Sequence, residues 1–534
     1  MLNSLFHAVI DLRIFAVAIA SLLLNPQGSA QSSCTSTPVA ALFPSDGGAG
    51  DAVGIRVATN AAGDRVVVAG TGHSHLGVQS GAAWVISSPG TLNSIEVELM
   101  PVGATADMRF GYSLATNAAG DIVVVGAPGT SSSPLGPRVY VYRFNGTAWI
   151  EEWHASSTYR DQQGYCVATS AAGDLIAAGA PMRTAAPGST IYNRGGVEVY
   201  RHLATGWAQE ATVLPSEAGG NDYVGNVIAL SSDGNTLAMR SFGHATPSLN
   251  GVVYLFQHSG TGWTQVARLQ EPVAYSTGGF GMAIALDTTA QTIALGNVWD
   301  SRLMYSQGAV SIFRKGPSGW GYETALLPSN PIVGGLFGSS VAINATGDRL
   351  LSGVPGHVGP TGLQHGAVIE FARDATGWVA APSQFSPNAP DLGAFGKSLS
   401  VSATGRRWII GEPGSTLHGT NAGLVHIFES PCVTPEIYCT AKTNRLGCVP
   451  QIGWQGTPSA SSPSGFAITA SNTRNQQYGT LFYGTNGRCS APWKGGTLCV
   501  QPPLVRTPLQ NAAGTPLPIN DCTGTFSFDF NTWT

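Results

Sequence analysis

A short sequence pattern occurs seven times along this chain, and its regular spacing constrains the fold more than any other feature. Each copy opens with a glycine, continues through a β-prone segment and a small polar turn, and ends in a run of mostly apolar residues. The opening glycines are 53 to 61 residues apart: Gly54, Gly111, Gly164, Gly225, Gly281, Gly338 and Gly396. A supersecondary unit that recurs at nearly constant spacing is typical of a repeat architecture.

Each copy is predicted to form four antiparallel strands. In the second copy, Pro128 ends the second strand because proline cannot donate to a β-ladder. The expected strands of this copy are residues 112–117, 122–126, 138–143 and 149–153. Four such strands make one blade of a β-propeller. The predicted fold class is therefore all-β: a seven-bladed β-propeller of four-stranded antiparallel blades, followed by a small C-terminal β domain that contains disulfides.

A tryptophan begins the fourth strand in five copies. Aromatic rings repeated around a ring-shaped protein would suit stacking on sugars, but their constant position in the repeat favours packing within the blades. We therefore predict a structural role for Trp149, Trp207, Trp263, Trp320 and Trp378.

The seventh copy lacks a fourth strand, since the chain leaves the pattern after Phe428 and reaches Cys432. Residues 36–45 resemble the ends of other fourth strands. We expect this N-terminal segment to complete the seventh blade and to close a propeller that spans residues 31–432. Cys34 and Cys432 would then lie where other blades have a hairpin turn. Their disulfide would close a loop of roughly 400 residues and contribute about 5 kcal/mol in chain-entropy models.

Residues 1–30 look like an export signal. Arg13 precedes an apolar run over residues 14–24 that is short for a bilayer span, and small residues precede a cleavage position after Ala30. An uncleaved membrane anchor is the alternative. The eight cysteines fit an oxidising compartment. We expect a secreted or cell-surface protein, monomeric and without a membrane span once the signal is removed.

The repeats resemble the FG-GAP family, whose seven-bladed propeller repeats occur in integrin α subunits and in many exported bacterial proteins. The motif combines a Phe-Gly pair with a glycine and a proline at the end of the second strand. The matching residues are Phe110, Gly111, Gly126, Pro128, Phe280, Gly281, Phe337, Gly338, Gly353, Pro355, Phe395, Gly396, Gly411 and Pro413. The resemblance covers about residues 36–431 and implies a seven-bladed propeller.

One departure from the family concerns calcium. Integrin-type repeats often carry an aspartate-rich calcium loop between the first two strands. Here the corresponding turn has a single aspartate after its glycine, such as Asp64 in the first copy, and the seventh copy has Arg406 at that position. Calcium takes six to eight oxygen ligands, so we predict turns in which Asp caps the backbone and no metal binds. Asx-type hydrogen bonds that shape loops, rather than a cation or ligand site, are expected for Asp51, Asp107, Asp161 and Asp222.

Other candidate residues form no recognisable active site. His73 and His75 share one loop, but no matching group of Asp, Glu or His is visible, so we predict a surface loop. Glu151 and Glu152 should point to opposite faces of a strand, and Cys166 is interpreted as a buried free thiol. No G-x-S-x-G, H-E-x-x-H or P-loop motif occurs. A net charge of −4 without a basic cluster disfavours nucleic acid as a partner. We predict no catalytic residues, metal or cofactor.

Residues 433–534 leave the repeat pattern and are richer in proline, serine, glycine and cysteine. They look like a C-terminal module of exported proteins from bacteria such as planctomycetes, which has no assigned activity. Five cysteines leave the connectivity open. The preferred pairs, which leave Cys489 odd, are Cys439 with Cys448 and Cys499 with Cys522.

The loops between second and third strands should fall on one face of the propeller, where binding usually resides. They vary most at residues 182–195, 243–250 and 356–365. By analogy with FG-GAP proteins, we expect an exported, non-enzymatic scaffold that binds a protein or glycan through its loops, with a role in adhesion or at the cell surface. The alternative is a secreted carbohydrate-active enzyme, a lyase or hydrolase with its site at the channel mouth. A third interpretation makes residues 433–534 a surface-attachment or sorting module.

Overall fold

The computed structural model divides the chain into two compact units, one of residues 33–430 and one of residues 1–32 and 431–534. The structure describes residues 7–8, 10–11, 36–91, 94–130, 132–157, 161–185, 189, 191–242, 251–260, 262–273, 279–359, 362–374, 376–387, 393–430, 444–455, 467–479, 482–484, 488–493, 496–500 and 504–529. The predicted cleavage after Ala30, and Cys34, Cys432 and Cys439, lie outside these residues. None of the described residues belongs to a helix with the length and hydropathy needed to cross a bilayer.

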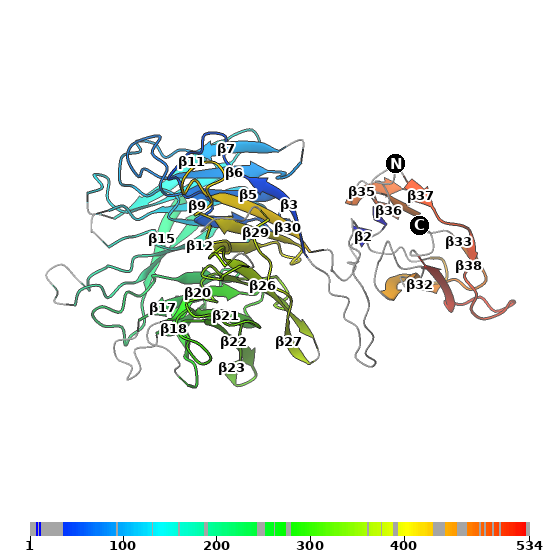
Figure 1. The fold of residues 1–534 in the computed structure, drawn as a ribbon. Helices are drawn as coiled ribbons and strands as arrows, with labels where there is room; N and C mark the ends of the chain where they lie inside the picture. Colours follow the sequence, from blue (N-terminus) through cyan, green and yellow to red (C-terminus); the bar gives the residue numbers. More distant parts are fainter. Residues whose placement is uncertain are drawn as a thin grey trace. The chain divides into compact units, whose positions relative to one another are not determined.

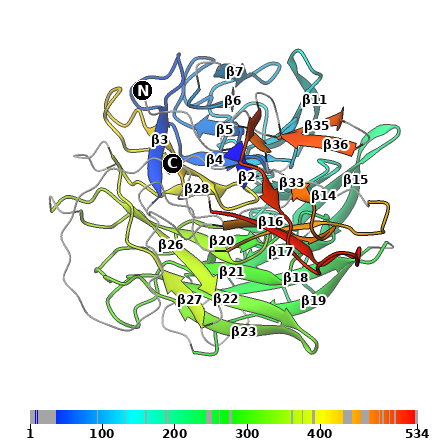
Figure 2. The same cartoon turned by 90° about the vertical axis from the view of Figure 1, so that its right-hand side faces the viewer.

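Seven four-stranded antiparallel sheets make up residues 37–429, and they follow one another around a ring (Figure 1, Figure 2). First strands of neighbouring sheets contact one another, so they line the axis of the ring. The predicted all-β, seven-bladed fold class is confirmed.

The first three sheets are β4 (Arg56–Thr59), β5 (Arg65–Gly70), β6 (Ala82–Ser87) and β7 (Ile95–Leu99); β8 (Ser113–Thr116), β9 (Ile122–Ala127), β10 (Arg138–Phe144) and β11 (Trp149–Ser156); and β12 (Val167–Thr169), β13 (Leu175–Gly179), β14 (Val197–Leu203) and β15 (Gly206–Val213). The next three are β16 (Ile228–Leu230), β17 (Thr236–Ser241), β18 (Val252–His258) and β19 (Trp263–Leu269); β20 (Phe280–Leu286), β21 (Thr292–Asn297), β22 (Ala309–Gly316) and β23 (Gly319–Leu326); and β24 (Val341–Ile343), β25 (Arg349–Val354), β26 (Ala367–Asp374) and β27 (Gly377–Ala380).

The seventh sheet is closed by the N-terminal segment. It consists of β28 (Ser398–Val401), β29 (Arg407–Glu412), β30 (Leu424–Glu429) and β3 (Thr37–Leu42), and β3 runs antiparallel to β30 with Leu42 opposite Val425. Leu42 is buried in a cluster that joins this sheet to the first one through Ile427 and Trp84. The expected completion of the last blade from the N-terminus is therefore observed in the strand pairing.

Glycines of the repeat motif allow neighbouring sheets to approach each other. A Cβ on Gly126, near the end of β9, would overlap the carbonyl oxygen of Gly164, which opens the next copy. The same backbone contact recurs between Gly179 and Gly225, Gly296 and Gly338, Gly353 and Gly396, and Gly411 and Gly54. The phenylalanines that precede four opening glycines are all buried between strands: Phe110, Phe280, Phe337 and Phe395.

The tryptophans at the start of the fourth strands are packing residues. Each is partly buried against one of the hydrophobic clusters of the propeller. Trp207 Nε1 donates to Glu152 at 3.3 Å, and Trp263 Nε1 donates to Glu210 at 3.0 Å, in each case a carboxylate of the preceding sheet. The predicted structural role is confirmed.

Polar turns connect first and second strands, as expected from the sequence. In the first sheet Asn60 Nδ2 donates to Asp64 Oδ1 at 2.7 Å, while Asn60 Oδ1 accepts from the backbone N–H of Arg65 at 3.0 Å. The same pair recurs at Asn117 and Asp121 at 2.7 Å. These aspartates therefore complete turns by hydrogen bonding.

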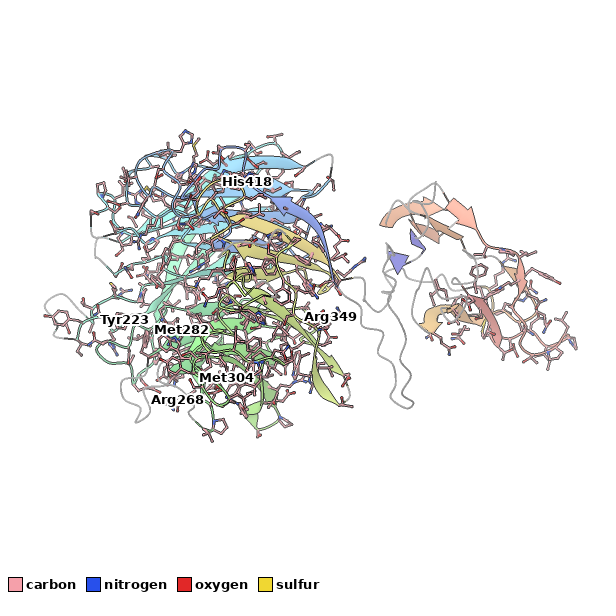
Figure 3. All side chains as sticks on the ribbon, viewed as in Figure 1. Tyr223, Arg268, Met282, Met304, Arg349 and His418 are labelled. Carbon is pink, nitrogen blue, oxygen red and sulfur yellow. A yellow bond between two sulfur atoms is a disulfide. The ribbon has the colours of Figure 1, made fainter. Side chains whose placement is uncertain are left out.

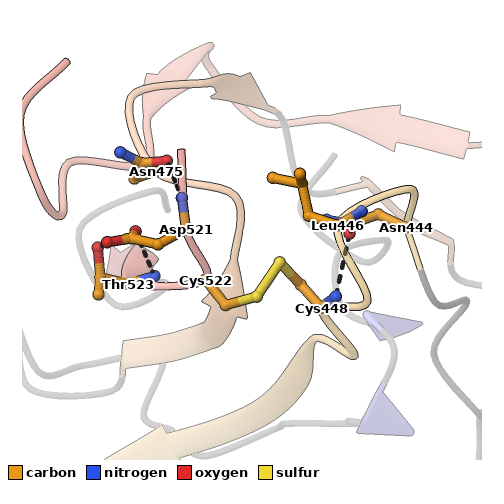
Figure 4. The surroundings of a disulfide bond; sticks show 7 residues. All are labelled: Asn444, Leu446, Cys448, Asn475, Asp521, Cys522 and Thr523. Carbon is orange, nitrogen blue, oxygen red and sulfur yellow. Dashed lines mark hydrogen bonds between the residues drawn. A yellow bond between two sulfur atoms is a disulfide. The ribbon is translucent and has the colours of Figure 1, made fainter. Parts of the chain in front are cut away.

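The C-terminal unit contains a disulfide between Cys448 and Cys522 (Figure 4). This bond excludes both preferred pairs, because each of them would use one of these two cysteines with another partner. The error has a physical cause: β31 (Gln451–Gln455) and β39 (Gly524–Asp529) both pair with β32 (Ala467–Thr473), which brings segments far apart in sequence together. The side chains of Cys489 and Cys499 lie outside the described residues.

Short strands make up the rest of this unit: β1 (His7–Ala8), β2 (Ile10–Asp11), β31 (Gln451–Gln455), β32 (Ala467–Thr473), β33 (Tyr478–Gly479), β34 (Phe482–Gly484), β35 (Arg488–Trp493), β36 (Gly496–Val500), β37 (Leu504–Arg506), β38 (Gln510–Asn511) and β39 (Gly524–Asp529).

Candidate functional site

Two sets of loops share one face of the propeller, which we call the loop face. One set joins second to third strands, and the other joins each fourth strand to the next first strand. Figure 3 labels Tyr223 on this face and Arg349, at the start of β25, on the opposite face. Single parallel bridges join the two sets at five junctions: Gly81 with Phe110, Gly195 with Val224, Gly308 with Phe337, Gly366 with Phe395, and Gly423 with Val53.

Aspartates hold several of these loops in shape. Asp51 and Asp222 each accept a backbone hydrogen bond at 2.7 Å from the residue three positions earlier. Asp161 accepts from the backbone N–H of Gln163 at 3.1 Å, whereas Asp107 accepts from the hydroxyl of Ser132. The predicted loop-shaping role is confirmed for the first three residues, and Asp107 acts through a side chain instead.

Large apolar side chains are exposed mainly on the loop face. In the described part of the propeller, the other exposed ones lie on fourth strands or at the end of β14, and none lies in the turns between first and second strands. Those on the loop face are Leu76, Val78, Met100, Val102, Met182, Ile191, Tyr192, Val273, Trp299, Leu303, Met304, Tyr305, Val333, Val358, Leu363 and Leu417.

The densest group lies in the β21–β22 loop, residues 298–308. Tyr305 is 75% exposed and Leu303 is 58% exposed. Val333 comes from the next loop, which is joined to this one because Gly334 N–H donates to the Tyr305 carbonyl at 2.9 Å. This loop is not among those expected to vary most, although its run of large apolar residues between two strands is visible in the sequence.

Ion pairs between buried side chains stabilise the conformation of this loop. Arg302 Nη2 lies 2.7 Å from Asp300 Oδ2 and 3.1 Å from Glu271 Oε1, and the Asp300 and Glu271 side chains are almost inaccessible to solvent. Burial raises the pKa of Glu271, whereas its hydrogen bond with Ser311 and the charge of Arg302 lower it in part. The exposed apolar residues therefore stand on a loop that is already ordered.

Two tyrosines and two cations, which lie on or just before first strands, come together near the axis. The Tyr112 and Tyr165 rings lie 4.9 Å apart, and the Arg56 guanidinium lies 5.7 Å from the Tyr112 ring. Burial raises the pKa of Tyr112, and burial followed by the charge of Arg56 lowers the pKa of Lys397. This group contains no cluster of His, Cys, Asp or Glu side chains. Among the described residues, such a cluster of three or more is found elsewhere, around Asp46.

Neighbouring acids and the odd thiol serve local contacts. Glu151 bonds to His154 at 2.9 Å, while Glu152 bonds to Arg143 at 2.9 Å, as expected for opposite faces of a strand. Cys166 is a free, partly buried thiol whose pKa is raised by burial. Because the thiolate is the nucleophilic form, this environment disfavours catalysis by Cys166.

A second cluster on the loop face joins the loop after β3 to the first sheet. Asp46 precedes the first copy, His73 and His75 lie in the β5–β6 loop, and Glu98 lies on β7. One potential ligand atom from each of these four residues lies within 4.8 Å of the others. His73 Nε2 lies 3.9 Å from Asp46 Oδ2, and His75 Nδ1 lies 3.9 Å from Glu98 Oε2.

The position of His73 corrects the sequence-based prediction. The loop lies at the surface as expected, since His75, Leu76 and Val78 are exposed. His73 itself is buried, and two carboxylates accompany the two histidines, so the expectation that no matching acids stand with them is wrong. Asp46 is fixed by Trp84 Nε1, which donates to its Oδ1 at 2.9 Å. Burial raises the pKa of Glu98, Asp46 adds to the rise, and His73 and His75 lower it in part. No sequence motif relates Asp46 and Glu98 to the two histidines, because the fold alone brings them together.

Comparison with known proteins assigns the chain to no family, since no protein-family model and no curated protein matches it.

Proposed function

We propose that the propeller is an exported, non-enzymatic scaffold that binds a macromolecular partner, and specifically a protein, through its loop face. The observation that carries this proposal is the exposed apolar group at Trp299, Leu303, Met304 and Tyr305, which stands on the loop held by Arg302. Large rigid anchors that are ordered before binding lose less conformational entropy in a complex.

The composition of this group favours a protein partner over a glycan. Tryptophan, tyrosine and methionine are enriched in protein interfaces, and hot spots are enriched in tryptophan and tyrosine. A glycan presents hydroxyl groups, and removing their bound water costs free energy unless a polar group of the protein replaces the lost hydrogen bonds. Leu303, Met304 and Val333 offer no such partner in their side chains.

The chemistry near the axis disfavours the alternative of a carbohydrate-active enzyme. A lyase or hydrolase needs an acid and a base that titrate near the working pH. Tyr112 and Tyr165 stand with Arg56 and Lys397. Burial lowers the pKa of Lys397, which suits a base, but it moves the pKa of Tyr112 away from neutrality, so Tyr112 does not supply the matching acid. We therefore favour binding over catalysis for this protein.

The FG-GAP resemblance supports the same proposal. Burial of the motif phenylalanines and the close backbone contacts of the motif glycines give these residues packing roles in the blades. We propose that the chain is a divergent FG-GAP propeller that acts outside the cytoplasm. Function follows from the loop residues rather than from this fold.

Paired loop and rim variants test the proposal. The purified chain is used to capture proteins from the extracellular and envelope fractions of its own organism, and the affinity of the captured protein is then measured by surface plasmon resonance. The double variant Leu303→Ser with Tyr305→Ser is expected to weaken binding at least tenfold, since anchors of this kind dominate interface energies.

A rim variant provides the matched control. Ile150→Ser with Val266→Ser removes two residues that are 50% and 48% exposed on fourth strands, so it should leave the affinity unchanged. Equal affinity of the loop variant and the wild type would overturn the proposal. Cleavage of a polysaccharide by the wild type that is lost in Tyr112→Phe would instead favour the enzyme.

A further inference from the structure

His73 carries a buried ring nitrogen that has no hydrogen-bond partner. The residue is 6% exposed, and its Nδ1 lies 2.8 Å from Asp51 Oδ2. An ionised carboxylate only accepts hydrogen bonds, so Nδ1 carries the proton of that bond. In the neutral ring the lone pair then belongs to Nε2, which is the buried, unpartnered atom. A histidine oriented in this way by a carboxylate is typical of metal ligands.

The unpartnered nitrogen faces the cluster of Asp46, His75 and Glu98. We propose that these three residues and His73 form a binding site for a divalent transition metal of the zinc type. The inference is independent of the proposed protein-binding function.

The donor set selects the class of metal. Two imidazoles and two carboxylates suit zinc, whereas calcium and magnesium take oxygen ligands almost entirely. Imidazole is also a good ligand for copper, iron and nickel, so geometry has to distinguish them from zinc. Four protein ligands match the closed, four-coordinate arrangement of structural zinc sites.

The spacing of the ligand atoms requires a modest contraction. Zinc bonds of 2.0–2.1 Å in a tetrahedron place ligand atoms about 3.3 Å apart, compared with 3.9 Å for the His73–Asp46 and His75–Glu98 pairs and a maximum of 4.8 Å. The His75 side chain is 56% exposed and the Asp46 side chain 36% exposed, so both have room to move towards buried His73.

The site lies where the ring closes. Asp46 follows the closing strand β3, and its neighbour Ser45 donates to Glu96 on β7 through the backbone at 2.9 Å and through the hydroxyl at 2.8 Å. The other three ligands belong to the first sheet and its loop. A bound ion would therefore fasten the segment after the closing strand to the first blade.

Metal titration tests the site. The purified full chain is stripped with a chelator, dialysed and titrated with Zn²⁺ by calorimetry and with Co²⁺ by visible absorption. The expected result is one ion per chain with micromolar or tighter affinity and a tetrahedral Co²⁺ spectrum. His75→Ala and Glu98→Gln change accessible or rim positions and should each weaken Zn²⁺ binding at least tenfold, and Asp51→Asn should weaken it ten- to a hundredfold.

A second histidine–glutamate pair provides the control. His154 lies 2.9 Å from Glu151 on β11, and no third His, Cys, Asp or Glu among the described residues joins this pair, so His154→Ala should leave the affinity unchanged. Absence of stoichiometric binding would overturn the proposal, and so would binding that His75→Ala and Glu98→Gln leave intact.

Discussion

Removal of residues 31–45 is expected to abolish the cooperative thermal unfolding of the propeller. Without β3, the backbone of β30 becomes an open edge, and such edges pair with other chains. The hydrophobic cluster around Trp84 and Ile427 also loses its contacts with Leu42 of β3. Circular dichroism melts and size-exclusion chromatography should show a lost transition and aggregation. Removal of residues 433–534 is the control, because that segment contributes no strand to the seven sheets.

Single substitutions in β3 give a graded form of this result. Leu42→Ala should cost about 2–5 kcal/mol of unfolding free energy because it leaves a cavity in a closely packed cluster. Val39→Ala, on the same strand but 47% exposed, should have a small effect. Similar losses for the two variants in chemical denaturation would contradict closure by β3.

The second large effect is expected at Gly411. A Cβ at this position would overlap the Gly54 carbonyl oxygen and the Ser398 hydroxyl, where the seventh blade meets the first. Backbone cannot move aside as a flexible side chain can, so Gly411→Ala should destabilise the propeller by about 1–3 kcal/mol or more.

A glycine in open space is the control for this substitution. No atom lies near a Cβ built on Gly321, which stands on the outer strand β23. Gly321→Ala should therefore be neutral or stabilise the chain by up to about 1 kcal/mol, since alanine restricts the unfolded chain. Urea midpoints measure both variants, and a midpoint for Gly411→Ala equal to that of the wild type would count against the packing described for the motif.

Local patterns in the sequence predict most of the propeller. The seven copies specify the strands because each copy combines alternating residues, polar turns and a buried apolar run, all of which act over a few residues. Closure was also predictable, since the missing fourth strand at Phe428 and the similar segment near Pro38 complement each other.

Features that depend on the packing of distant segments could not be predicted in the same way. Asp46 and Glu98 meet His73 because the β3–β4 loop, the β5–β6 loop and strand β7 converge at the ring closure. Cys448 meets Cys522 because β31 and β39 flank β32, a pairing that no local spacing encodes. The apolar residues around Tyr305 can be recognised in the sequence, but the ion pairs of Arg302 that order their loop are seen only in the structure.

Amide hydrogen exchange with and without the captured partner tests most directly whether the loop face binds a protein. We expect slower exchange in residues 298–308 and 329–335 of the bound propeller, with unchanged exchange in the outer strands β11 and β19. Protection confined to those outer strands, or to the C-terminal unit, would contradict it.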